Sequence, residues 1–295
     1  MPLSFGISPA LVTPFSREGV DTARLLAHAQ DLLDRGCRSV TVFGTTGEGP
    51  SVGAAERDRV AAEFVRQGVP AERLVEGVIA SSIEEAVFST GRALRRGAKA
   101  VLLAPPFYFR PAPDEAVFAW FAEVFRALGP DLRDMILYHI PGMTGVPISV
   151  PVIRRLVEAF PGAVLGVKDS ACDAEATMAL IAAFPDLIVL VGDESYLGRA
   201  CAAGAGGSIC GVANVAPEAV IALAEAGRDD PRVVDLVRAI SRYPIIPIVK
   251  ALVAQVKGDP AWAAPRPPLV ASTPAEVAEV APFLAPLRAP AGAAA

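Results

Sequence analysis

Eight short runs of apolar and β-branched residues recur along this chain of 295 residues, and segments with helical patterning separate them. Strands joined through helices pair in parallel by right-handed crossovers. Eight such repeats are the number that closes a (β/α)₈ TIM barrel, with an open doubly wound sheet as the competing α/β arrangement. The predicted strands are Gly6–Val12, Ser39–Phe43, Leu74–Ile79, Ala100–Leu103, Met135–Ile140, Ala163–Lys168, Leu187–Val191 and Gly207–Gly211.

Helical segments fill the intervals and continue past the last strand. Residues 1–215 are predicted to form the barrel, 216–288 a C-terminal helical extension, and 289–295 a disordered tail of small residues. The helices predicted between strands include Asp21–Arg35, Ala54–Arg66, Ile83–Arg95 and Asp114–Leu128. Those predicted after the last strand are Pro217–Ala226, Pro231–Ile240, Ile246–Val256 and Pro274–Leu284.

Composition excludes several classes of protein. Hydrophobic residues make up 53% of the chain and charged residues 20%, which is typical of a folded protein with a large core. A net charge of −5 argues against nucleic acid or anionic membrane as the main partner. The amino terminus lacks the pattern of a signal peptide, and no apolar run approaches the ~20 residues that span a bilayer, so we expect a cytoplasmic protein. The four cysteines form no C-x-x-C pair, which indicates neither a disulfide framework nor a zinc site.

The search for a catalytic group begins at the carboxyl ends of the strands, where barrel enzymes carry their active sites. Only one of the four lysines, Lys168, ends a predicted strand on that side. A lysine that ends an apolar strand inside a barrel is poorly solvated, which disfavours its ammonium form. Its neutral amine attacks a carbonyl to form a Schiff base, which then accepts an electron pair. The alternative is a structural lysine that pairs with Asp169 or extends to the rim.

Two neighbouring features favour the catalytic interpretation. Tyr138 lies near the end of the preceding predicted strand, and its phenol can pass the protons that imine formation requires. The segment Gly44-Thr45-Thr46-Gly47-Glu48-Gly49 directly follows the second strand. Its glycines allow successive N–H groups to converge, and its threonines add hydroxyl donors, so it is a candidate cradle for a carboxylate. A tight strand-to-helix turn explains the same segment.

Together these features resemble the dihydrodipicolinate synthase/N-acetylneuraminate lyase family of Schiff-base (class I) aldolases. The resemblance covers nearly the whole chain, and its motifs follow one another in a single order. The segments that carry it are Ala10–Phe15, Gly44–Glu48, Pro106–Tyr108, Tyr138–Pro141, Gly166–Asp169, Gly192–Glu194, Ile209 and Gly211–Val215.

The resemblance implies a role for each of these positions. Lys168 is implied as the imine-forming lysine and Tyr138 as the proton relay. Thr45 and Thr46 are implied to hold the carboxylate of pyruvate, with Thr46 linking Tyr138 to Tyr108 of an adjoining subunit. The resemblance further implies a pyruvate-lining backbone around Gly192 and Ile209, and a homotetramer built from tight dimers. Gly47 belongs to the same carboxylate cradle.

One departure limits the substrate assignment. Family synthases carry an arginine that grips the carboxylate of aspartate semialdehyde, and Met143 stands in its place here. A thioether makes no charge-assisted pair, which weakens carboxylate recognition by about 2 kcal/mol or more. We therefore favour a pyruvate-dependent lyase or aldolase acting on a 2-oxo acid such as a deoxy-sugar acid, whose hydroxyls Asp193 and Glu194 could receive. The alternatives are 4-hydroxy-tetrahydrodipicolinate synthase and a 2-oxo-3-deoxy acid dehydratase.

No cofactor or metal is expected, because the lysine itself supplies the electron sink. His139 has no orienting partner in the sequence pattern, and we interpret it as structural. Two rival functions stay open. A phosphate-binding barrel enzyme would use Gly204, Gly206 and Gly207, although these precede the eighth strand and so lie toward the wrong face. A non-catalytic binding protein would keep the fold without turnover.

Overall fold

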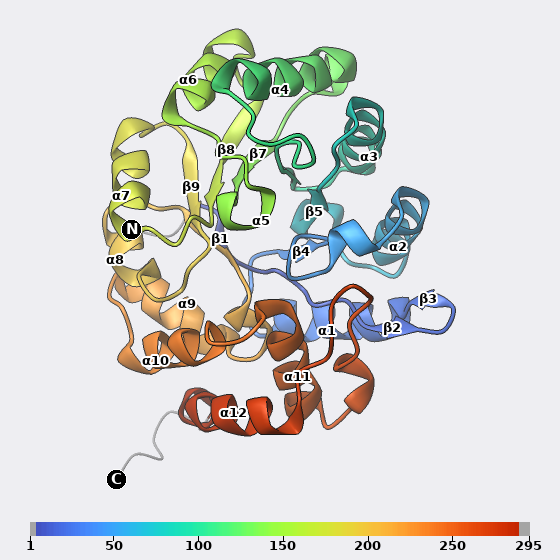
Figure 1. The fold of residues 1–295 in the computed structure, drawn as a ribbon, viewed down its shortest axis with the longest axis vertical. Coiled ribbons are helices and arrows are strands. Elements are labelled where there is room, and N and C mark those ends of the chain that lie inside the picture. The colour runs from blue at the N-terminus through green and yellow to red at the C-terminus, as the bar shows by residue number, and fades with distance from the viewer. Residues whose placement is uncertain (1–3, 289–295) are drawn as a thin grey trace.

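Eight parallel strands form the centre of the molecule, which we describe from a computed structural model over residues 4–288. The sheet order is β1-β10-β9-β8-β7-β6-β5-β4, so each strand pairs with its neighbour in the predicted sequence of repeats. The strands occupy the middle of the picture in Figure 1 and helices surround them. Their bounds are β1 Gly6–Pro9, β4 Val40–Val42, β5 Leu74–Val78, β6 Ala100–Leu103, β7 Met135–His139, β8 Val164–Asp169, β9 Ile188–Val191 and β10 Gly207–Cys210.

Contacts between β1 and β4, the strands at the two ends of the sheet order, close the sheet into a barrel. Ala10 forms a parallel bridge with Thr41, and the N–H of Leu11 donates to the Thr41 carbonyl at 2.9 Å. The hydroxyls of Ser8 and Thr41 share a hydrogen bond of 2.8 Å beside that bridge. The open doubly wound sheet is therefore wrong, and the predicted barrel is confirmed.

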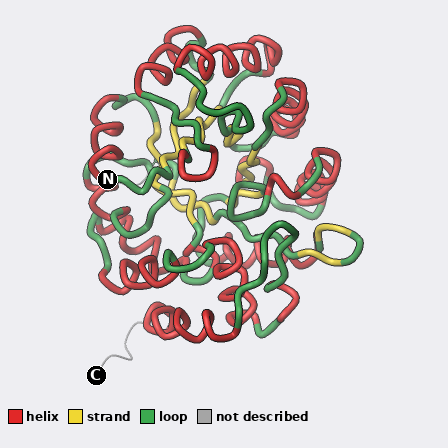
Figure 2. Tube along the Cα trace, viewed as in Figure 1, coloured by secondary structure: helices red, strands yellow, loops and turns green. Residues whose placement is uncertain are grey.

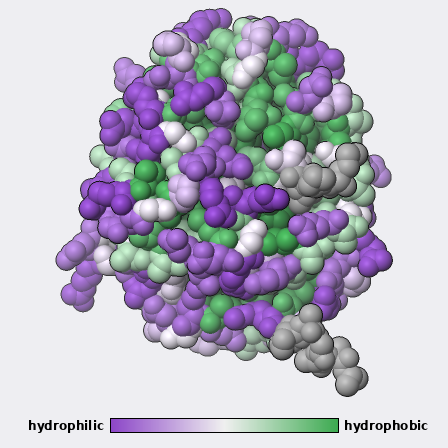
Figure 3. Space-filling model, turned by 180° about the vertical axis from the view of Figure 1, so that it is seen from behind, coloured by the Kyte–Doolittle hydropathy of each residue, from purple (hydrophilic) through white to green (hydrophobic). Residues whose placement is uncertain are grey.

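Helices form a ring outside the strands (Figure 2). Four of them begin at an Asp or Ser side chain that accepts a backbone N–H of the first turn, which explains why the local sequence starts a helix there. Seen from behind, polar side chains are spread across the whole visible face, with apolar areas between them (Figure 3). The ring comprises α1 Thr22–Asp34, α2 Ala54–Arg66, α3 Ile83–Arg96, α4 Asp114–Leu128, α6 Val150–Ala159, α7 Ala174–Ala183, α8 Leu197–Ala202 and α9 Pro217–Ala226.

Three further helices, α10, α11 and α12, lie together at one side of the barrel, at the bottom of Figure 1. They span Pro231–Ile240, Ile245–Lys257 and Pro274–Arg288. A β2–β3 hairpin (Phe15–Ser16 and Gly19–Val20) and the single-turn helix α5 (Pro141–Thr144) complete the elements, with 3₁₀ turns at Gly49–Ser51, Ala71–Arg73, Gly129–Asp131, Val212–Asn214 and Pro260–Trp262.

The predicted element boundaries agree with the structure to within a few residues. Helix α12 runs past its predicted end at Leu284 to Arg288, although it contains Pro282 and Pro286. Its buried side chains, which include Leu284 and Leu287, pack toward α10 and hold the segment helical against its proline content. Helix α9 packs against α8 and β1. The domain boundary at residues 215–216 stays a prediction, and the tail 289–295 lies outside the described residues.

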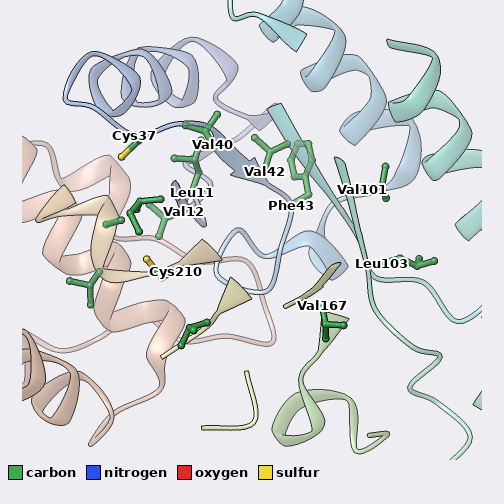
Figure 4. Close-up of a cluster of buried hydrophobic side chains, with 14 of the residues drawn as sticks. Leu11, Val12, Cys37, Val40, Val42, Phe43, Val101, Leu103, Val167 and Cys210 are labelled. Carbon is green, nitrogen blue, oxygen red and sulfur yellow. The ribbon is translucent and has the colours of Figure 1, made fainter. Parts of the chain in front are cut away.

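The strands divide the core into two layers because successive side chains point to opposite faces. Inside the barrel lie Ile136 and Tyr138 of β7 together with Leu190 of β9 and Ile209 of β10. The alternate positions point outward to the helices and belong to a second buried cluster, part of which Figure 4 shows together with side chains from the adjoining loops. The residues labelled there are Leu11, Val12, Cys37, Val40, Val42, Phe43, Val101, Leu103, Val167 and Cys210.

Candidate active site

The central feature of the site is a pair of side chains on adjacent strands. Tyr138 of β7 and Lys168 of β8 are direct partners in the parallel register. Both belong to the inward-facing set of positions, so the register places their side chains together inside the barrel. Lys168 Nζ donates a hydrogen bond of 3.2 Å to the Tyr138 hydroxyl and lies 4.3 Å from the centre of the same ring.

Lys168 is buried without a carboxylate partner. Its exposed fraction is 4%, and among residues 4–288 no carboxylate oxygen lies within 4.0 Å of its Nζ. The neighbouring Asp169 points to the other face of β8, where its carboxylate accepts hydrogen bonds from the Thr177 hydroxyl and the Ala171 N–H. The structural alternative, an ion pair between Lys168 and Asp169, is therefore wrong.

The Tyr138 hydroxyl continues the chain of hydrogen bonds by donating to Thr45 Oγ1 at 3.0 Å. The resemblance had implied Thr46 as the link to Tyr138, and this is wrong because the Thr45 side chain is the one turned toward the phenol. An amine, a phenol and a hydroxyl thus form one connected set. Such a set can pass a proton to and from an atom bound at the amine.

The loop that carries Thr45 is a compact turn held by backbone contacts. The carbonyl of Gly47 accepts from the Thr13 hydroxyl at 2.6 Å, and a Cβ on Gly47 would come within 2.7 Å of the Leu11 carbonyl oxygen. This close approach requires glycine. No acceptor within the described part of the chain meets the backbone N–H groups of residues 45–47. These free donors, near the Thr45 and Thr46 hydroxyls, are suited to an anion.

A buried ion pair anchors the far end of the same loop. Glu48 follows Gly47 and has a left-handed backbone conformation, with φ of 53°. Its carboxylate accepts from Lys250 Nζ at 2.5 Å and from the Arg266 N–H at 2.8 Å. Lys250 also donates to the Thr13 carbonyl at 2.7 Å, and Phe15 lies against both cations. Helix α11 and the segment after it therefore fix the loop that follows β4.

A cavity of about 310 Å³ opens above the paired side chains. Its inner end comprises Thr45, Thr46, Tyr138, Lys168 and the strand-end positions Gly192 and Ile209. The predicted cluster is thus largely brought together by the fold. Beyond these, the lining consists of Ile140, Gly142, Met143, Ser170, Cys172, Glu194, Cys210, Gly211, Val212, Val237, Ile240, Ser241, Ile245 and Val249.

Three predicted residues lie outside this cavity. Gly47 is turned into the loop, and the carboxylate of Asp193 accepts from the Ser195 N–H at 2.9 Å without reaching the lining. The contact between Asp193 and a ligand hydroxyl therefore stays a prediction. Tyr108 is 75% exposed and packs edge-to-face on Phe109, away from the Lys168 cluster in this single chain.

Glu194 does reach the cavity, but its carboxylate is already engaged. One oxygen accepts from the Val212 N–H at 2.7 Å. Burial raises the pKa of this carboxyl, and the nearby Asp193 acts in the same direction. Glu194 therefore brings an acidic group to a wall that otherwise contains mainly apolar side chains.

Sequence reasoning missed the contribution of the helical extension. Val237 and Ile240 of α10 and Ile245 and Val249 of α11 line the outer part of the cavity. A weak signal was present in α10, where Val237 lies beside the buried stripe of Val233, Leu236 and Ile240 and widens its apolar surface. Nothing in the spacing of α11 indicated the site.

Other candidate chemistries find no support in the geometry. Within residues 4–288 no three His, Cys, Asp or Glu side chains are grouped as metal ligands. His139 Nδ1 accepts the Ile148 N–H at 2.9 Å, in agreement with a structural role. Gly206 and Gly207 lie at the amino end of β10, opposite the cavity, which argues against the phosphate-binding rival. No helix in the described range has the length and apolarity to cross a bilayer.

Comparison with known proteins gives a consistent family. Residues 3–283 match the model of the dihydrodipicolinate synthetase family. A 4-hydroxy-tetrahydrodipicolinate synthase of Methanopyrus kandleri is 31% identical and covers 90% of both chains. An uncharacterized DapA-like lyase of Chloroflexus aurantiacus is 34% identical over 75% of this chain and 74% of its own. The crystal structure of dihydrodipicolinate synthase from Agrobacterium tumefaciens superposes with a TM-score of 0.93 and 44% identity, covering 96% of this chain and 99% of that one.

Proposed function

The chain belongs to the dihydrodipicolinate synthetase family, and from this premise we propose that it is a pyruvate-dependent lyase or aldolase that works through a Schiff base on Lys168. The observation that carries the proposal is the buried Lys168 amine, which has a phenol at 3.2 Å and no carboxylate partner. A structural lysine would be expected to pair with an acid when buried. An imine-forming lysine requires a free electron pair on its nitrogen.

The proposed reaction uses the three connected groups in turn. The Lys168 amine attacks the carbonyl carbon of a 2-oxo acid and expels water to form the imine, while Tyr138 passes the protons through Thr45. The protonated imine draws in the electron pair of the breaking carbon–carbon bond, which leaves an enamine and frees an aldehyde. Protonation of the enamine carbon and hydrolysis by the returning water then release pyruvate and the free amine.

The carboxylate of the 2-oxo acid is proposed to lie on the loop after β4. The Thr45 and Thr46 hydroxyls line this end of the cavity, and the N–H groups of residues 45–47 have no acceptor within residues 4–288. Charge-assisted hydrogen bonds to such donors orient the acid so that its carbonyl carbon faces the amine. This needs no metal or other cofactor.

Three related reactions proceed through the same imine. The names of relatives favour 4-hydroxy-tetrahydrodipicolinate synthase, which is the name of the Methanopyrus kandleri relative. Met143 at the cavity mouth disfavours that activity, because it offers no cation to the carboxylate of aspartate semialdehyde. Our first choice therefore stays aldol cleavage or condensation of a 2-oxo acid. A 2-oxo-3-deoxy acid dehydratase is the third candidate.

We further propose that the protein is a homotetramer built from tight dimers and that it is located in the cytoplasm. Tyr108 and Phe109 form an exposed aromatic pair, 75% and 84% exposed in the single chain. Large exposed aromatic side chains that lie together are typical of interaction sites. Tyr108 is proposed to extend the hydrogen-bonded set of an adjoining subunit, as the family resemblance implies.

Reductive trapping tests the imine directly. Incubation with pyruvate and borohydride is expected to add one reduced pyruvate to the wild-type protein, located on Lys168 by peptide mass spectrometry. Lys168→Ala should show no addition while its circular dichroism spectrum stays native. Lys257→Ala, a surface lysine paired with Asp31, is the matched control and should be trapped like the wild type. An unmodified wild-type protein would contradict the mechanism.

A further inference from the structure

The part of the cavity beyond Lys168 differs in chemistry from its inner end. The polar groups assigned to a 2-oxo acid gather at the end formed by Thr45, Thr46, Tyr138 and Lys168. The full cavity, at about 310 Å³, lies at the lower end of the range of about 300–1,000 Å³ that ligand pockets occupy, and pyruvate is too small to fill it. A second reactant, or the rest of a longer acid, must meet the outer walls.

Aliphatic side chains from three parts of the fold form those walls. Helices α10 and α11 supply Val237, Ile240, Ile245 and Val249, and the segments after β7 and β10 supply Ile140, Met143 and Val212. Ile240, Val249, Val212 and Ile140 are buried, whereas Met143 and Ile245 are half-exposed and mark the opening. An apolar ligand group gains about 25 cal/mol for each Å² that such walls remove from water.

Charged groups are sparse in the same cavity. Among the described residues that line it, Lys168 is the sole cation and Glu194 the sole acid. Lys168 is committed to the imine, so a second carboxylate would meet no cation and would be placed near Glu194. Burying an unpaired charge is costly. Arg110 packs against Gly145 next to the Met143 segment but does not line the cavity.

Hydroxyl-rich ligands are also poorly matched to these walls. Ser241 already donates its hydroxyl to the Val237 carbonyl at 2.8 Å, and Glu194 already accepts the Val212 N–H. Ser170 is the remaining hydroxyl in the lining beyond the inner end. A sugar acid would bury several hydroxyls against Val237, Ile240 and Val249, each at a cost in free energy.

Resting on the proposed Schiff-base function, we infer that the group beyond the 2-oxo acid is uncharged and apolar, so that the second reactant is an aliphatic or aromatic aldehyde. In cleavage, the bond between carbons 3 and 4 of a 4-hydroxy-2-oxo acid breaks, its electron pair enters the imine, and the proton of the 4-hydroxyl passes to Tyr138. The products are the apolar aldehyde and pyruvate. Condensation is the reverse.

A panel of aldehydes tests this assignment. The purified protein is given pyruvate with hexanal, benzaldehyde, glyceraldehyde or succinate semialdehyde, and pyruvate consumption is followed. We expect kcat/KM for hexanal and benzaldehyde to exceed the values for the other two by at least about tenfold, the lower end of the discrimination that apolar pockets achieve. Borohydride trapping of pyruvate on Lys168 is run in parallel without any aldehyde.

Variants at the half-exposed opening sharpen the result, because substitutions there leave the core intact. Ile245→Ser should lower kcat/KM for hexanal by about threefold or more, without changing pyruvate trapping. Met143→Arg should move the preference toward succinate semialdehyde. Val270→Ser, at a position that is 80% exposed and is not part of the cavity lining, is the matched control and should behave as the wild type.

The trapping experiment and the aldehyde panel test the Schiff-base function and the apolar second reactant separately. Absence of trapping in the wild type would overturn the Schiff-base function and this inference with it. Intact trapping together with a preference for glyceraldehyde or succinate semialdehyde, or with no reaction of either apolar aldehyde, would overturn this inference alone. A preference for the semialdehyde that Arg110→Ala abolishes would show that Arg110 serves as the missing cation.

Discussion

Two buried lysines of this chain, Lys168 and Lys250, have opposite environments. Lys168 ends β8, is 4% exposed and has the Tyr138 hydroxyl as its hydrogen-bond partner. Lys250 lies within α11, is fully buried and contacts both the Glu48 carboxylate and the Thr13 carbonyl. Burial alone therefore does not identify a reactive amine.

The two lysines differ in the polar groups that replace the water each side-chain nitrogen loses on burial. A carboxylate at 2.5 Å stabilises Lys250 as a cation, so this lysine serves to hold the β4 loop against the extension. Lys168 faces a phenol and an open cavity, where a carbonyl carbon can approach it. The proposed chemistry needs both, because the loop that Lys250 holds also carries Thr45.

Removal of Lys168 is expected to have the largest effect on activity. Lys168→Met should lower the rate of pyruvate consumption by at least about a thousandfold, because no other amine lines the cavity in the described chain. The free energy of unfolding, measured in urea, should change by less than about 1 kcal/mol, since methionine fills similar space and no acid loses its partner. A large loss of stability would mean that Lys168 is structural.

Removal of Lys250 is expected to give the opposite result. Lys250→Met leaves the Glu48 carboxylate buried without its cation, so the free energy of unfolding should fall by about 3–5 kcal/mol. Glu48→Gln in the same chain should restore part of that loss. Pyruvate should still be trapped on Lys168 in the folded fraction. If the single variant unfolds at the wild-type urea concentration, the pair does not anchor the loop.

The smallest expected effect is a loss of folding stability at low pH, which arises where the barrel contacts the helical extension. His28 of α1 is buried beside Asn214 and the Trp262 ring, and burial lowers its pKa to about 4, with Lys257 adding to the shift. The unfolded chain, with an ordinary pKa near 6.5, therefore binds the proton first as the pH falls. Stability is complete above that value and is lost between about pH 6.5 and 4, by about 2 kcal/mol from pH 7 to 5.

Urea unfolding at pH 7 and pH 5 measures this loss. His28→Gln keeps an amide near Asn214 and removes the titration. Between pH 7 and pH 5 its free energy of unfolding should therefore fall by about 2 kcal/mol less than that of the wild type. Equal declines in the two proteins would show that His28 does not control the pH dependence. Trapping on Lys168 should respond equally to pH in both, because His28 does not line the cavity.

Period-two alternation and the order of the repeats were enough to predict the central pair. Tyr138 and Lys168 occupy inward positions near the carboxyl ends of consecutive strands, and parallel pairing then sets them opposite each other. The same alternation turns Asp169 away from the amine, where it meets Thr177. These relations depend on local geometry and on neighbouring strands, so the amino-acid order determined them.

Only the tertiary structure decided which of two adjacent threonines meets the phenol, which residues wall the outer cavity and which lysine pairs with an acid. The first depends on a tight turn held by Leu11 and Thr13. Glu48 and Lys250 are 202 residues apart, and Ile240 lies on a helix that joins the site from outside the ring of repeats. No periodicity encodes such contacts, because they arise when separate elements pack against one another and exclude water together.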